Sequence, residues 1–451
     1  MQHIIPGNHL LPVADKNRIQ ALDILRGIAL LGILLMNIPE FSLPRRYSED
    51  FRNDPESINF WARVIMLLFF EGKMRALFSL LFGAGIVLFF TNKTAVTKVV
   101  VKLFYKRMFW LIVFGLIDAY LLLWDGDILY LYAVTGMIAV LFLRVKSKWL
   151  VWAVPLVAIV EFVLQTSFYQ DIREKRMAYV ATTKAISGDT GATKEQQEVM
   201  EEWREIEKTF LPNTQDIAEH TRTMKSNYAA IAKKKRALSW QYQTTYLIYS
   251  IWDPLALMLL GMALLRWGFL TNQWTTRQYR WTLILGYGLG LPLVAWEIYY
   301  GYRYIPNLEA WLAQMENIRI PWHNLLYPIQ RIAIMMGHIA LVMLIIRRGI
   351  LKRLLGCLAA VGQIALTNYI MQTILCSFIF LGFGLNYFDA FQYYQIFYFI
   401  VVIWLFQLLT SSIWLQYFLF GPLEWLWRVL TYWKIQGFRR DRSNENQHAV
   451  I

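Results

Sequence analysis

The sequence predicts an all-α, polytopic integral membrane protein with about ten transmembrane helices and one polar extracytoplasmic insertion. Of its 451 residues, 57% are hydrophobic and 17% are charged, and the mean hydropathy is +0.37. Soluble domains average roughly 45–50% apolar and 25% charged residues. The apolar residues also cluster in runs of about 20, the length of a helix that crosses the ~30 Å hydrocarbon core of a bilayer.

These runs set the expected spans. We predict helices over residues 21–39, 74–91, 105–124, 127–144, 149–168, 245–267, 280–300, 323–346, 357–381 and 394–418. A shorter apolar stretch at 58–70 ends at Glu71-Gly72-Lys73, a pattern typical of a half-helix at membrane depth. The first run starts near Ala21, and no small-x-small cleavage site follows it. We therefore expect a membrane helix there and not a cleaved signal peptide.

Lysines and arginines gather in alternate connections between these runs. The connections over 91–107, 144–148, 266–280 and 347–353 are basic, whereas those around 124–127 and 382–393 carry acids and no base. Cytoplasmic loops of membrane proteins are enriched in Lys and Arg. The alternation therefore predicts a multi-pass plasma-membrane protein with both termini in the cytoplasm. The formal net charge of +14 belongs to this basic rim, so we expect no nucleic-acid partner.

The composition divides the chain into five regions. These are a cytoplasmic leader (1–20), amino-terminal transmembrane helices (21–168), a polar extracytoplasmic insertion (169–244), carboxyl-terminal transmembrane helices (245–418), and an interfacial amphipathic helix with a basic cytoplasmic tail (419–451). Within the insertion, Glu195–Lys208 and Ala218–Leu238 have helical patterns, and Gly188 and Gly191 mark a break. We interpret the insertion as a solvated helical hairpin without chemistry; the alternative is a surface that binds a partner.

Charged side chains in the first expected helix are the first candidates for function, because a charge at membrane depth is costly. Asp23 and Arg26 are three residues apart and share a face. Asn37 returns to nearly the same face about four turns later. The pair is either a helix-end ion pair at the cytoplasmic boundary or a site where Arg26 binds an anionic substrate, and the sequence leaves both interpretations open.

A second charged group surrounds the break at Gly72. Glu71, Lys73 and Arg75 lie there, just before the small-residue stretch SLLFGAG that allows close helix contact. A glutamate beside a lysine at a helix break can position an anion or act as a base. The alternative is a charge cluster that anchors the helix at the interface.

Three acids lie near the outer ends of the third and fourth expected helices. Asp127 is placed to cap the helix that follows Gly126, but capping does not explain Asp118 inside the span. We expect Asp118, Asp125 and Asp127 to form an outer acidic pocket that serves as a general base, cation site or proton relay. His323 lies at the same boundary and is expected to reach this pocket.

Arg331 and His338 are seven residues apart and share a face of the eighth expected helix. They are candidates for substrate binding, although a lone membrane histidine is as often a hydrogen-bonded packing residue. The two cysteines lie in or beside apolar runs and predict neither a disulfide framework nor a metal site. The sequence also has no Walker loop, dinucleotide fingerprint, HExxH or GxSxG motif.

Four stretches resemble one family. They are RIQALDILRGIALLGILLMNI (18–38), FFEGKMRALFSLLFGAG (69–85), WDGDILYLYAVTG (124–136) and GQIALTNYIMQ…FGPLEWLWRVLTY (362–432). They are similar to the YeiB-like bacterial membrane proteins, the family called domain of unknown function 418, within the transmembrane acyltransferase group. In one branch of that group, the Asp-x-x-Arg helix ends in a functional histidine where this chain has Asn37. YeiB-like relatives often have a histidine where this chain has Asp118, so we expect a carboxylate to replace imidazole as base.

The resemblance implies an acyltransferase-like enzyme. An acyl group would move from a cytoplasmic donor such as acyl-CoA to an extracytoplasmic lipid or glycan acceptor, with membrane lipids as further partners. Arg26 and the basic loops would hold the anionic donor, and the outer acids with His323 would activate the acceptor. The alternative is a transporter or flippase of a small or lipid-like solute, supported by the helix breaks at Gly72 and Asp253-Pro254. A third interpretation is a scaffold whose insertion binds a partner.

Overall fold

The computed structural model describes residues 19–44, 54–91, 97–186, 192–210 and 213–440. Within them every named element is a helix, which confirms the all-α class; an isolated bridge joins Phe418 to Arg439. The helices are α1 (Gln20–Ser42), α2 (Ile58–Phe69), α3 (Lys73–Thr91), α4 (Lys98–Tyr120), α5 (Leu129–Ala139), η3 (Val140–Phe142), α6 (Ser147–Ile186), α7 (Lys194–Phe210), α8 (Thr214–Met224), α9 (Tyr228–Gln243), α10 (Leu247–Ser250), α11 (Trp252–Arg266), α12 (Thr276–Tyr304), α13 (Leu308–Asn317), η4 (Trp322–Leu325), α14 (Leu326–Arg348), α15 (Lys352–Gln363), α16 (Ala365–Phe380), α17 (Tyr393–Tyr417) and α18 (Pro422–Tyr432).

Several helices have the length and apolar composition that crossing a membrane requires. In the described residues there are seven: Gln20–Ser42, Ile58–Thr91, Ser147–Ile186, Leu247–Arg266, Thr276–Tyr304, Trp322–Arg348 and Tyr393–Tyr417. The bent pair α15 and α16 makes an eighth. The expected number of ten is therefore not confirmed. The fourth expected span corresponds to Leu129–Phe142, which is shorter than a full crossing. The third corresponds to α4, whose first half is rich in Lys and Arg.

The structure differs from the expected helices at two places. The run expected over 357–381 is broken at Ile364, where α15 and α16 meet at 84°. The helix expected over 149–168 continues without interruption to Ile186 as α6. Its polar half is held by α13 and the residues after it: Tyr169 donates to the carbonyl of Ile318 at 2.8 Å, and Arg173 donates to that of Met315 at 3.0 Å.

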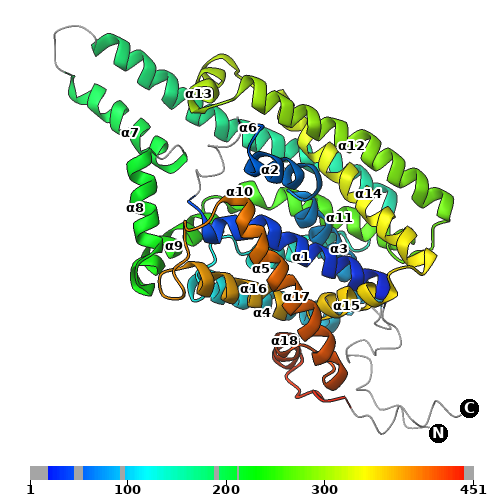
Figure 1. Cartoon of the computed structure of the whole chain (residues 1–451). Helices are drawn as coiled ribbons and strands as arrows, with labels where there is room; N and C mark the ends of the chain where they lie inside the picture. The colour runs from blue at the N-terminus through cyan, green and yellow to red at the C-terminus, as the bar shows by residue number, and fades with distance from the viewer. Residues whose placement is uncertain (1–18, 45–53, 92–96, 187–191, 211–212, 441–451) are drawn as a thin grey trace, which may run out of the picture.

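Tight packing between helices depends on glycines at two crossings. A side-chain carbon added at Gly27 of α1 would lie 2.0 Å from the carbonyl oxygen of Leu358 in α15, and one added at Gly261 of α11 would lie 1.8 Å from that of Leu80 in α3. Figure 1 shows α1 running through the middle of the bundle, beside α15, α16 and α17. Small residues let membrane helices approach this closely.

The expected break at Glu71-Gly72-Lys73 is present between α2 and α3. Gly72 has φ +71°, in the left-handed region that favours glycine. A side-chain carbon there would also lie 2.3 Å from the Tyr327 hydroxyl of α14. The break therefore brings the charged residues around Gly72 against α14.

The insertion is folded in part onto the carboxyl-terminal end of α4. Its expected second helix is two helices, α8 and α9, and α7 and α8 extend away from the bundle (Figure 1). The Arg236 side chain of α9 donates to the carbonyl of Tyr120 at 2.9 Å, and the Tyr228 hydroxyl donates to that of Leu121 at 2.8 Å. The break expected at Gly188 and Gly191, residues 1–18 of the leader and residues 441–451 of the tail lie outside the described residues.

Candidate functional site

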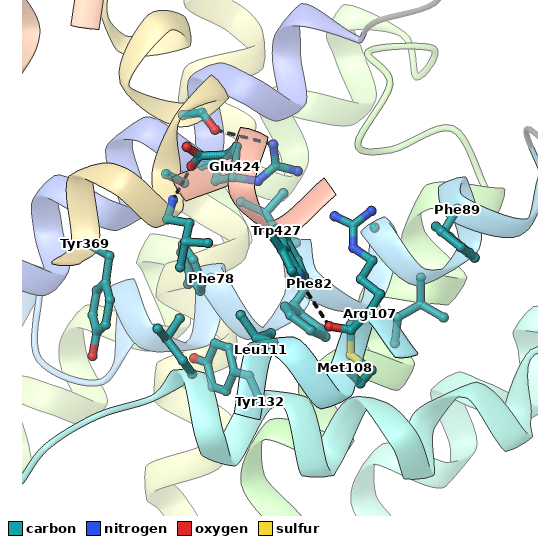
Figure 2. A pocket seen from close by; sticks show the side chains of 18 of the residues that line it. Phe78, Phe82, Phe89, Arg107, Met108, Leu111, Tyr132, Tyr369, Glu424 and Trp427 are labelled. Atoms are coloured by element: carbon teal, nitrogen blue, oxygen red, sulfur yellow. Dashed lines mark hydrogen bonds between the residues drawn. The ribbon is translucent and has the colours of Figure 1, made fainter. Parts of the chain in front are cut away.

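A cavity of about 240 Å³ lies among α1, α3, α4, α5, α15, α16 and α18. Arg26, Arg107 and Arg428 line one part of it together with Glu424. Figure 2 shows the middle of the cavity walled by Phe78, Phe82, Leu111 and Tyr132, between Tyr369 on one side and Arg107 on the other. We call this space the basic cavity. Its lining combines clustered cations with an apolar channel.

Each arginine of the basic cavity contacts a carboxylate or an aromatic ring. Arg26 donates to Asp23 one turn back on α1, at 2.9 Å, which confirms the pairing expected from their spacing. The Arg107 guanidinium lies 4.1 Å from the centre of the Trp427 ring, and the Trp427 indole donates to the Arg107 carbonyl at 2.9 Å. The Arg428 guanidinium lies 4.0 Å from the centre of the Phe420 ring. Helix α18 therefore forms part of this cavity, in addition to its expected place at the interface.

Glu424 explains the bend between α15 and α16. Its carboxylate accepts hydrogen bonds from the backbone N–H groups of Leu366 at 2.7 Å and Thr367 at 3.1 Å, and from the Thr367 hydroxyl at 2.6 Å. These are the unsatisfied donors of the first turn of α16. A carboxylate there also complements the helix dipole. A residue of α18 thus caps a helix that begins inside the bundle.

Two of the three expected outer acids meet at the end of the basic cavity nearest Tyr369. Asp127 caps α5, as expected, by accepting from the N–H groups of Leu129 at 3.1 Å and Tyr130 at 2.9 Å. The Asp127 carboxyl group is in hydrogen-bonding contact with the Asp118 carboxyl group and with the Tyr369 hydroxyl. Asp118 is 0% exposed. Asp118 also accepts from the Thr373 hydroxyl at 3.4 Å, so the two carboxyl groups lie together inside the bundle.

Tyr369 separates the two acids from the cavity. Its hydroxyl accepts from the Trp124 indole at 3.1 Å and from the Ile128 N–H at 3.2 Å, which leaves its own proton for Asp127. Tyr369 lines the cavity, whereas neither Asp118 nor Asp127 does. Tyr369 is therefore a polar lining residue that contacts the acids.

Asp125 is directed away from the other two acids. It accepts from Lys235 of α9 at 2.7 Å, and the Lys235 side chain is 5% exposed. The Lys235 ammonium also lies 5.8 Å from the centres of the stacked Phe41 and Trp124 rings. The insertion thus supplies a buried partner to the α4–α5 connection, which a purely solvated hairpin would not do.

A second cavity, of about 290 Å³, lies among α2, α12 and α14 beside the Gly72 break. Its charged and polar lining is Arg63, Glu71, Lys73, Glu297, Tyr327 and Gln330. We call it the mixed-charge cavity. The expected residues Glu71 and Lys73 lie here, apart from the basic cavity that contains Arg26.

Arg75 and Arg331, two more of the expected residues, line neither cavity and share one carboxylate. Arg331 of α14 donates to Asp253 at the start of α11, and Arg75 is 3.7 Å from the other oxygen of the same carboxylate. The Arg75 carbonyl accepts from the Tyr132 hydroxyl at 3.2 Å. The Arg331 guanidinium lies 4.9 Å from the centre of the Tyr327 ring. This network therefore connects a wall residue of the basic cavity with one of the mixed-charge cavity.

Both expected histidines have neighbours within the protein. Nε2 of His338 lies 2.8 Å from the Phe69 carbonyl and Nδ1 lies 2.7 Å from the Tyr287 hydroxyl. A neutral ring that donates to the carbonyl and accepts from the hydroxyl satisfies both contacts, so His338 holds the end of α2. His323 packs on the Tyr300 ring at 6.1 Å. Asn37 and His323 line neither cavity.

Sequence reasoning did not select several residues of these sites. Arg107 was counted as part of a basic loop, and it is the last of the basic residues in the first half of α4, beside Met108. Lys235 is one of four consecutive bases, and its neighbours in sequence give no signal for the buried one. Tyr369 and Glu424 lie in the motifs of the family resemblance, but their partners are too distant in sequence to predict.

These features define a polytopic all-α membrane protein with two cavities among its apolar helices. A family model described as "Protein of unknown function (DUF418)" matches residues 264–434. The chain is 29% identical to "Uncharacterized protein YeiB" of Escherichia coli (strain K12) over 91% of this chain and 95% of the relative. It is 29% identical to "Uncharacterized protein YxaH" of Bacillus subtilis (strain 168) over 94% and 96%. It is also 25% identical to "Uncharacterized 39.9 kDa protein in amylase 3'region" of Bacillus acidopullulyticus over 93% and 96%.

These matches confirm the resemblance to the YeiB-like, DUF418 family that the four sequence stretches indicate. No solved structure is a significant match.

Proposed function

We propose that this protein is a membrane acyltransferase whose basic cavity holds an acyl donor with an anionic carrier group, such as acyl-CoA. The observation that carries the proposal is the joining of three arginines to an apolar channel in one cavity. Arginine binds phosphate groups through charge-assisted hydrogen bonds, and the channel lined by Phe78, Phe82 and Leu111 suits a hydrocarbon chain. The carrier's phosphates would lie at the arginines, its thioester-bearing arm would reach towards Tyr369, and the acyl chain would lie along the apolar wall.

The transfer step needs a group that accepts a proton. The acceptor hydroxyl or amine attacks the thioester carbonyl, the carbon–sulfur bond breaks, and the carrier leaves as a thiol. The acceptor proton would pass by way of the Tyr369 hydroxyl to the Asp118–Asp127 pair, which is in hydrogen-bonding contact with it, and a proton would return by the same route to the leaving thiolate. The basic residues at the start of α4 support a cytoplasmic position for the arginine end of the cavity.

A transporter of a lipid-like solute is the second candidate. The observation that favours it is the 84° bend between α15 and α16, because helices broken at membrane depth line the binding sites of many transporters. A transporter would use the same cavity without breaking a bond in its ligand. The two candidates therefore differ in the product and not in the place of binding.

Gly85 of α3 allows a direct test of the cavity. It lines the cavity, and a side-chain carbon added there meets nothing within 4 Å. Gly85→Leu should therefore fill the channel without disturbing the packing. Gly288→Leu is the matched control, because Gly288 is an exposed glycine of α12 with equally open space around it.

The experiment measures binding of radiolabelled palmitoyl-CoA and release of free CoA thiol by the full chain in lipid nanodiscs. We expect wild type and Gly288→Leu to bind and to release thiol, Gly85→Leu and Arg107→Gln to lose at least tenfold in affinity, and Asp127→Asn to bind without release. Binding without release by wild type, with an acceptor-containing lipid mixture present, would favour the transporter. Equal binding by wild type and Gly85→Leu would contradict any role for the cavity.

A further inference from the structure

The mixed-charge cavity contains balanced and separated charges, unlike the basic cavity. Its cations are Arg63 and Lys73, and its acids are Glu71 and Glu297. Lys73 is 2% exposed, and the Leu67 carbonyl accepts from its ammonium at 2.5 Å. The neutral amide of Gln330, also 2% exposed, donates to Glu297. Charges this deeply placed between apolar helices are costly unless they have a partner.

The cavity's own residues satisfy these charges incompletely. Arg63 lies 3.9 Å from Glu71, which is beyond hydrogen-bonding distance. The same Glu71 oxygen, Oε2, is buried and has no hydrogen-bond partner among the described residues. Lys73 is an ammonium with three donors, one of which Leu67 accepts. The cavity thus has a buried acceptor and a buried cation in one space of about 290 Å³.

We propose that the mixed-charge cavity binds a zwitterion, a group that has a primary ammonium and an anion a few bonds apart. The anion would lie between Arg63 and Lys73, and the ammonium would donate to Glu71 and Glu297. Two cations and two acids line the cavity, so a ligand without net charge leaves the total balanced. A simple anion or cation would leave the cavity with one uncompensated net charge.

The apolar part of the wall shows which zwitterions fit. Phe60, Val64 and Ile298 line the same cavity between α2 and α12. An aliphatic stem attached to the zwitterion would therefore contact apolar side chains. The same chemistry occurs in a phosphoethanolamine lipid headgroup and in a free glycerophosphoethanolamine, and the test includes both. The site does not depend on acyl transfer, since it is measured by binding in the absence of any acyl donor.

The experiment measures binding by calorimetry to the full chain, purified in a detergent without ethanolamine lipids. The probes are glycerophosphoethanolamine, dihexanoyl phosphatidylethanolamine, glycerol 3-phosphate for the anion alone and ethanolamine for the cation alone. We expect at least one zwitterionic probe to bind at least tenfold more tightly than either single-charge probe. Binding of the free headgroup identifies a headgroup site, and binding of the lipid alone identifies a site that also needs the acyl chains.

Variants connect the binding to this cavity. Glu71→Gln and Arg63→Gln change side chains that are 34% and 22% exposed, so we expect both to fold and to weaken zwitterion binding at least tenfold. Lys73→Met should abolish it. Glu309→Gln, on the exposed first turn of α13, is the matched control and should bind as wild type does. Equal binding of single-charge probes, no binding of either zwitterion, or unchanged binding in Glu71→Gln and Arg63→Gln would overturn the proposal.

Discussion

Arg331 of α14 and Asp253 at the start of α11 form an ion pair whose side chains are 3% and 9% exposed. Arg75 of α3 approaches the same carboxylate at 3.7 Å, with a side chain that is 51% exposed. One acid therefore holds two cations from two other helices. Removing the acid and removing one arginine therefore have unequal effects. Asp253 keeps a partner if either arginine is removed, whereas a buried Arg331 loses its carboxylate if Asp253 is removed.

These unequal effects predict which of two variants loses more stability. Asp253→Ala should destabilise the protein by about 3–5 kcal/mol, because it leaves Arg331 charged and buried without its carboxylate. Arg331→Met should cost less, since Arg75 still compensates Asp253. Unfolding of the purified protein in detergent, followed by intrinsic tryptophan fluorescence, measures both. Equal losses would show that Arg75 is too solvated to compensate Asp253, and a greater loss in Arg331→Met would contradict the explanation.

The cap that Glu424 provides for α16 predicts that its removal loosens the first turn of that helix. Glu424→Ala removes the acceptor of the Leu366 and Thr367 N–H groups, and removal of a helix cap costs about 0.5–2 kcal/mol. Hydrogen exchange of the amides at 365–368 should rise, while exchange in α17 should stay as it is in wild type. Glu316→Ala is a suitable control, because Glu316 pairs with Arg176 of α6, far along the chain from α16. Unchanged exchange at Leu366 would show that the bend is held without Glu424.

Local patterns in the sequence were enough to predict the membrane class, the Asp23–Arg26 pair and the break at Gly72. Each depends on neighbours within one or two helical turns, where spacing fixes geometry. The cap that Asp127 provides for α5 is of the same kind. Expectations of this sort concern one helix at a time, and the structure agrees with them.

Contacts between distant segments could not be predicted in the same way. Asp125 and Asp127 are two residues apart, yet one pairs with Lys235 of the insertion and the other meets Asp118. Their directions depend on the turn between α4 and α5 and on the docking of α9, which no local pattern specifies. The broken helix at Ile364 follows from Glu424, some sixty residues further on. The charged residues therefore divide between two cavities and an acid pair instead of forming one site.

The buried contact between α9 and the α4–α5 connection predicts a coupling between two variants. Asp125→Asn and Lys235→Met should each loosen α9, because each removes the ion pair between the buried ammonium and the carboxylate. The double variant leaves neither charge, so its loss of stability should be smaller than the sum, with a coupling of roughly 0.5–3 kcal/mol. The rate of limited proteolysis within 213–243 measures the docking of α9. Additive losses would contradict a direct interaction.

Asp389, in the connection between α16 and α17, predicts how stability depends on pH. Burial raises the pKa of its carboxyl group above the ordinary value, although the charge of Lys225 and the hydroxyl of Thr221 act in the opposite direction. A raised pKa means that the folded state holds the proton more tightly than the unfolded state, so the stabilisation is complete at low pH and is lost as the pH rises through the folded pKa. Asp389 also has φ +56°, a conformation that asparagine tolerates well.

Asp389→Asn should therefore keep the backbone conformation and an acceptor for Thr221, while removing the cost of a buried charge. At pH 7 the variant should unfold at a slightly higher temperature than wild type, and the difference should shrink as the pH falls and wild-type Asp389 becomes protonated. Asp54→Asn, at an exposed acid, should shift the unfolding temperature equally little at both pH values. Unfolding curves in detergent between pH 4 and pH 7 measure the effect. A variant that unfolds at a lower temperature than wild type at pH 7 would show that Lys225, and not burial, controls this carboxylate.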